Sequence, residues 1–164
     1  MASETTAAAG GAVGNLSFDP MAMLPFCGYH MADYFAHWLK IGKHADAAKL
    51  PKIFFVNWFR RGEDGRFLWP GYGENSRVLK WVFERVDGKS GASHTPIGLL
   101  PSPSAIDTTS LDIAADDLAA LLSVDTEGWS SAVPQIKEHY ARFGSHLPSE
   151  LSAALSTLER ALSV

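Results

Sequence analysis

The sequence contains very little cysteine: one residue, Cys27, in a chain of 164. A single cysteine excludes a disulfide within the chain and a metal site built from several thiolates, and it suits a reducing compartment. No apolar run reaches the roughly 20 residues that a membrane-spanning helix needs. The N-terminus also lacks the basic and hydrophobic regions of a secretion signal. We therefore expect a soluble cytoplasmic protein with no membrane contact.

Positive charge is not in excess either, because 14 Lys and Arg face 18 Asp and Glu, a formal net charge of -4. No overall field therefore attracts nucleic acid, and we expect none as a partner. An alternative is the binding of single-stranded RNA through aromatic rings and the pair Arg60-Arg61. The rings could stack on the bases, but the chain has little positive charge to attract the phosphates.

The common catalytic motifs are missing as well. GGAVG and GYGENS have glycines, but neither continues as the GK[ST] of a phosphate loop or as GxGxxG. No GxSxG elbow occurs, and the six histidines are scattered without the spacing of a zinc-binding helix. The residues alone assign no catalytic side chain and no metal ligand.

The apolar pattern indicates one α/β chain in three regions. Residues 1–17 are rich in Ala, Gly, Ser and Thr, too poor in apolar surface to become ordered by burial. Residues 18–100 contain a helical stripe, a mostly buried strand at 52–59, a hairpin, and a helix that Asn75 or Ser76 caps and Gly88 ends. Residues 101–164 form a helical subdomain with Pro134 and Pro148 at breaks or starts. We expect the strands to form a small mixed sheet.

The stretch 57–77, NWFRRGEDGRFLWPGYGENSR, carries five aromatic residues in a polar, glycine-rich setting. A purine site needs flat rings for stacking and an amide that reads the edge of the base. Phe59, Phe67 and Tyr72 supply the rings, and Asn75 supplies the amide. The alternative is a hairpin whose aromatic residues simply pack on the core, which is the position we expect for Trp58 and Trp69.

The longer stretch NWFRRGEDGRFLWPGYGENSRVLKWVFERVDG resembles the C-terminal part of the GTP-dependent phosphoenolpyruvate carboxykinases. The segments ETTAAAGGAVG, FDPMAMLPFCGY and KLPKIFFVNWF precede it in the same order as in that family. The resemblance is strong from about Ser3 to Gly98 and more diffuse through the helical tail.

This resemblance implies a reversible, gluconeogenic conversion of oxaloacetate and GTP to phosphoenolpyruvate, GDP and carbon dioxide, with Mn²⁺ and Mg²⁺. In the family, three aromatic rings enclose the guanine and the asparagine of GEN contacts it. The matching positions are Phe59, Phe67, Tyr72 and Asn75, and Tyr72 stands where many members have Phe. His30 replaces an Asn that commonly follows GY.

The resemblance also implies a lid and a missing half. Residues from about Thr6 to Leu16 resemble the family's mobile lid, whose closure would exclude water from the reaction. The family's phosphate loop, manganese ligands and substrate-binding arginines precede the lid, and this sequence does not contain them. We expect a C-terminal fragment that is inactive alone and whose partner is the missing N-terminal portion. The alternative is a non-enzymatic partial paralogue that serves as a protein-binding or scaffold piece.

Overall fold

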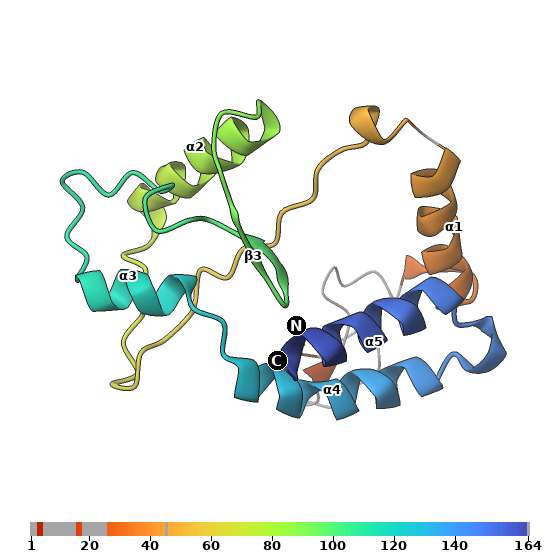
Figure 1. The fold of residues 1–164 in the computed structure, drawn as a ribbon. Helices are drawn as coiled ribbons and strands as arrows, with labels where there is room; N and C mark the ends of the chain where they lie inside the picture. Colours follow the sequence, from red (N-terminus) through yellow and green to blue (C-terminus); the bar gives the residue numbers. More distant parts are fainter. Residues whose placement is uncertain (1–2, 5–15, 18–25, 45, 164) are drawn as a thin grey trace. The chain divides into compact units, whose positions relative to one another are not determined.

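The computed structural model describes residues 3–4, 16–17, 26–44 and 46–163. The chain divides into two compact units, one of Met1–Leu50 with Glu127–Val164 and one of Pro51–Thr126 (Figure 1). Nearly all of the predicted lid falls outside the described residues, so its role stays a prediction. Within the described residues, every helix is too short or too polar to cross a bilayer.

The first unit is built mainly from three helices, and ring contacts join two of them. Phe35 lies in α1 (Met31–His44), and Phe143 follows α4 (Thr126–Ala141). Their rings pack edge to face, with centroids 5.5 Å apart. His30 precedes α1, and its Nδ1 accepts a hydrogen bond from the backbone N–H of Ala32 at 3.2 Å. Lys137 of α4 forms an ion pair with Glu159 of α5 (Ser149–Leu162). The elements are β1 (Ser3–Glu4), β2 (Leu16–Ser17), α1 (Met31–His44), η3 (Ala47–Lys49), α4 (Thr126–Ala141), η5 (Gly144–His146) and α5 (Ser149–Leu162).

The second unit surrounds a small core of Trp69, Trp81 and Ile106, which are the buried members of one apolar cluster. Trp58 packs against this cluster and Trp69 is 6% exposed, so the inward packing predicted for both tryptophans is confirmed. The elements are η4 (Tyr72–Glu74), α2 (Asn75–Val86), β3 (Ser93–Thr95), β4 (Gly98–Leu100) and α3 (Ala115–Leu122).

The predicted combination of helices and strands is confirmed at that coarse level. The named strands of the described residues form two antiparallel pairs, β1 with β2 and β3 with β4. A mixed sheet is not present among them. Helix α2 ends where the sequence predicts, because Gly88 adopts φ of +71° just beyond it and the N–H of Lys89 bonds the carbonyl of Glu84 at 2.8 Å.

The mostly buried strand predicted at 52–59 is wrong for this structure. The segment 51–57 is extended, but no backbone hydrogen bond joins it to another part of the described chain. Phe54 packs edge-on against Trp81 at 5.9 Å, whereas Ile53 is 90% exposed. The sequence is apolar on both faces of the segment, and only one face meets the core of this unit.

Candidate functional site

The site predicted at 57–77 begins with a short hairpin, which confirms the hairpin predicted from the turn residues. Arg61 and Phe67 form an antiparallel bridge, and Leu68 N–H donates to the Arg60 carbonyl at 3.0 Å. At the tip, Gly65 has φ of +76°, a left-handed conformation that strongly favours glycine. The Asp64 carboxylate accepts the Arg66 N–H at 2.9 Å, and this bond lowers the pKa of Asp64. Local turn chemistry therefore sets the register that brings Phe59 and Phe67 together.

Helix α3 supports this hairpin at its base and near its tip. At the base, the Arg60 guanidinium donates to the carbonyls of Leu121 and Ser123, at 3.3 and 2.9 Å, where α3 ends. Near the tip, Arg66 pairs with Asp117 at 3.0 Å, which raises the pKa of the arginine. A cation near the C-terminal carbonyls of a helix also meets the negative end of its dipole. Arg60 thus has a structural role that the sequence did not reveal.

The three aromatic residues of the predicted site are placed differently. The rings of Phe59 and Phe67 lie edge to face, with centroids 6.0 Å apart and planes at 61°. The Arg61 guanidinium lies 4.0 Å from the centroid of the Phe67 ring. Phe59 is 72% exposed and Tyr72, at the start of η4, is 96% exposed. Among the described residues, the Tyr72 ring contacts neither phenylalanine.

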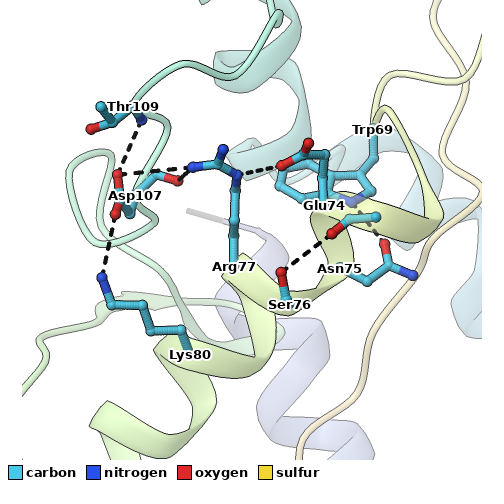
Figure 2. A network of polar contacts seen from close by, with 9 residues as sticks. Trp69, Glu74, Asn75, Ser76, Arg77, Lys80, Asp107 and Thr109 are labelled. Carbon is cyan, nitrogen blue, oxygen red and sulfur yellow. Dashed lines mark hydrogen bonds and ion pairs between the residues drawn. The ribbon is translucent and has the colours of Figure 1, made fainter.

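Asn75 is the first residue of α2, but the capping role predicted for it is wrong. Its Oδ1 accepts a hydrogen bond from the indole N–H of Trp69 at 2.9 Å instead of an N–H of the helix (Figure 2). Ser76, the other predicted cap, donates its hydroxyl to the Gly73 carbonyl at 3.3 Å. The residue at the N-cap position is Glu74, which makes no side-chain capping bond. Asn75 is therefore fixed by the core and not by the helix backbone.

A network of charged groups holds the turn that contains Asn75 (Figure 2). Arg77 pairs with Glu74 one helical turn back and donates to the backbone carbonyl of Asp107 at 2.9 Å. Lys80 reaches the Asp107 carboxylate at 3.3 Å. The N–H of Thr109 and the ammonium of Lys80 lower the pKa of Asp107 to about 2. The start of α2 is thus tied to the loop around Asp107.

The sequence contains part of the signal for this network. Glu74 and Arg77 are three residues apart, a spacing at which side chains meet on one helix face. Nothing local indicates Asp107, because it lies 30 residues further along the chain than Arg77. The hydrogen bond from Trp69 to Asn75 could not be predicted from the sequence either, because buried tryptophans are common in protein cores.

Two other features of the described residues do not belong to this site. A cavity of about 360 Å³ lies between α4 and α5 and is lined by Lys137, Tyr140, Leu155 and Glu159, among others, and by none of the predicted site residues. No group of three or more His, Cys, Asp or Glu is arranged to hold a metal ion within the part of the chain that the structure describes.

Comparison with known proteins gives a consistent result over the chain. Residues 1–161 match the family described as phosphoenolpyruvate carboxykinase C-terminal P-loop domain. Proteins named phosphoenolpyruvate carboxykinase [GTP] are 57% identical over 163 residues in Neocallimastix frontalis and 54% over 159 residues in Treponema pallidum (strain Nichols). The corresponding protein of Chlamydia muridarum is 50% identical over 163 residues.

The matches cover 96 to 99% of this chain. In contrast, they cover only 26 to 27% of the length of these relatives. The chain thus spans about one quarter of the length of these relatives. By its sequence, the chain belongs to the family of GTP-dependent phosphoenolpyruvate carboxykinases.

Proposed function

We propose that this chain is the guanine-binding part of a GTP-dependent phosphoenolpyruvate carboxykinase. Phe59, Phe67 and Tyr72 would stack on the base, and Asn75 would bond its edge. The observation that carries the proposal is the hairpin, which places two phenylalanines from separate backbone segments in contact on an exposed surface. An exposed aromatic pair and an amide held in one orientation a few residues further along the chain are suited to a planar ligand with a polar edge.

Binding would require the rings to rearrange. Phe59 and Phe67 contact each other edge to face, which leaves no parallel slot between them. We propose that the base stacks on this pair and that the exposed Tyr72 ring then folds over its other face. Ring rotation at a mostly exposed position requires little repacking, so the nucleotide itself would complete the site.

In the whole enzyme, this base site would position GTP for the conversion of oxaloacetate to phosphoenolpyruvate, GDP and carbon dioxide, with Mn²⁺ and Mg²⁺ held elsewhere. The cytoplasm and gluconeogenesis are the setting we propose. Phosphoryl transfer depends on positioned cations and phosphate-binding groups. The sequence contains no GK[ST] phosphate loop, so we expect this chain alone to bind nucleotide without turning it over.

Titration of the chain with GTP and with ATP, followed by tryptophan fluorescence, tests this function. Trp69 bonds Asn75 directly, so occupation of the site should quench its emission. We expect saturable quenching by GTP at concentrations where ATP has little effect. Equal responses to both nucleotides would refute guanine selectivity, and no response to either would refute nucleotide binding at this site.

A second candidate function is docking to a protein, and a specific set of exposed residues favours it. Leu79, Phe83 and Val86 form an exposed apolar stripe on α2, and Ile53 and Phe55 are exposed on the neighbouring extended segment. Lys52 bonds the carbonyls of Arg85 and Val86, which holds that segment beside the end of α2. Apolar side chains beside an unpaired extended backbone are typical of surfaces that another chain covers.

We propose that the occupant is the remaining three quarters of a carboxykinase chain, which would also complete a mixed sheet along 51–57. Mixing this chain with the preceding part of a full-length relative should restore phosphoenolpyruvate formation from oxaloacetate and GTP. Phe83→Asp should abolish the recovery, and Ser104→Asp, which adds the same charge at an exposed loop position, should not. If both variants restore activity equally, this surface is not the docking site. If the two parts form a complex without activity, the chain acts as a scaffold piece instead.

A further inference from the structure

The hydrogen bond between Trp69 and Asn75 determines which atoms of the asparagine are available to a ligand. An indole N–H only donates, so the Asn75 atom that lies 2.9 Å from it must be the amide oxygen. Trp69 is 6% exposed and belongs to the core cluster with Trp81, so its indole has little freedom to move. The amide of Asn75 is therefore held in one of its two orientations.

This orientation leaves the amide nitrogen for a ligand. No described residue accepts a hydrogen bond from the Nδ2 of Asn75, although the side chain is half-buried. Reversal of the amide would bring its N–H groups against the indole N–H and leave a buried donor unsatisfied. Asn75 thus presents its two donors to a ligand and holds its acceptor oxygen against the core.

Guanine and adenine differ in what they offer to such a group. Guanine carries two acceptors on one edge, O6 and N7, whereas adenine carries an amino donor at position 6 beside N7. An asparagine with both of its amide atoms free pairs well with adenine, because it accepts from the amino group and donates to N7. An asparagine whose oxygen already accepts from a buried indole is directed toward the core, so it makes that pair less well with the one lone pair that remains.

We propose that Trp69 is a positioning residue that sets base selectivity by holding Asn75 as a donor. The inference rests on the proposed function, since it assigns a cause to the selectivity of the same site. Purines with an oxygen at position 6 bind, and purines with an amino group there are rejected. Trp69 acts only through Asn75 and does not touch the base.

The test uses Trp69→Phe, which keeps an aromatic ring in the core and removes the indole N–H together with part of the ring volume. Trp81→Phe is the matched control, because Trp81 is equally buried and its N–H bonds the Gly91 carbonyl at 3.4 Å, not a site residue. Isothermal titration would give the affinities for GTP, ITP, ATP and 2,6-diaminopurine riboside triphosphate. Circular dichroism would verify that both variants fold.

The unaltered chain should prefer the two 6-oxo nucleotides, GTP and ITP, over the two 6-amino nucleotides. In Trp69→Phe this preference should fall about tenfold, the order of one hydrogen bond, mainly through tighter binding of the 6-amino pair. Trp81→Phe should keep the preference. In Asn75→Ala the preference should be lost, and adding Trp69→Phe should then change nothing further, as coupled residues require.

Three outcomes would count against the idea in different ways. If Trp69→Phe weakens all four nucleotides equally, or keeps the preference, Trp69 is only a packing residue and guanine binding still stands. If the effect of Trp69→Phe persists in the Asn75→Ala background, the indole acts by another route. If the unaltered chain binds none of the four, the proposed function fails, and this inference fails with it.

Discussion

Removal of the Phe59 ring is the sharpest test of the aromatic site, because binding and stability should respond very differently. The ring is 72% exposed, and its main aromatic contact is the edge-to-face pair with Phe67. Loss of such a pair costs about 0.5–1.5 kcal/mol, toward the low end when the ring is solvated. Loss of a ring that stacks on a base costs about 1–3 kcal/mol of binding free energy. We therefore expect Phe59→Ala to weaken GTP binding about 5- to 150-fold while the chain remains folded.

The matched control is Phe83→Ala, which removes the same ring from a position that is 70% exposed on α2. Phe83 lies two helical turns from Asn75, about 12 Å along the helix axis. Isothermal titration with GTP should show an unchanged affinity for this variant, and thermal unfolding should show small shifts for both. If the two variants bind GTP alike, Phe59 is not a stacking residue, and a hairpin that only packs on the core becomes the better interpretation.

Three further results are expected. Arg60→Ala should lower the free energy of unfolding of the Pro51–Thr126 unit by about 1–3 kcal/mol, because the carbonyls at the end of α3 lose a charged donor, and urea unfolding followed by fluorescence measures it. Tyr72→Phe should leave GTP affinity within about twofold, since stacking uses the ring, whereas a large loss in titration would mean that the hydroxyl binds the ligand. The pKa of Asp107 is about 2 in the folded chain, below its ordinary value, so its contribution to stability is present above about pH 4 and is lost as the pH falls toward 2. Unfolding measured across this range should show a weaker dependence on pH in Asp107→Asn, and an unchanged slope would contradict the role of its bonds to Thr109 and Lys80.

The elements that the sequence predicts well are those with a local cause. The hairpin follows from Gly62, Asp64 and Gly65, whose turn chemistry acts within five residues. Helix α2 follows from apolar spacing and from the glycine at its end. In each case, the residues that determine the structure are neighbours in the chain, so their pattern can be read directly.

The predictions that failed or were absent depend on contacts between distant segments. The segment 51–57 is apolar on both faces, which is typical of a buried strand, but whether it is buried depends on what lies against its second face. The bonds from Arg60 to the end of α3 and from Arg77 to Asp107 join residues 30 or more positions apart. No spacing rule indicates such partners, because they are determined by the packing of the whole unit.

The failed prediction for Asn75 is informative about the site. An asparagine at the start of a helix normally caps it, and the cap stabilises the helix by about 1 kcal/mol. Here the side chain bonds a buried indole instead, and α2 begins without a side-chain cap. Positions where a chain departs from such a local rule tend to be functional sites. The departure gives α2 less stability than a cap would, and it holds the two N–H donors of Asn75 in one orientation, which is the arrangement that the proposed recognition of a 6-oxopurine requires.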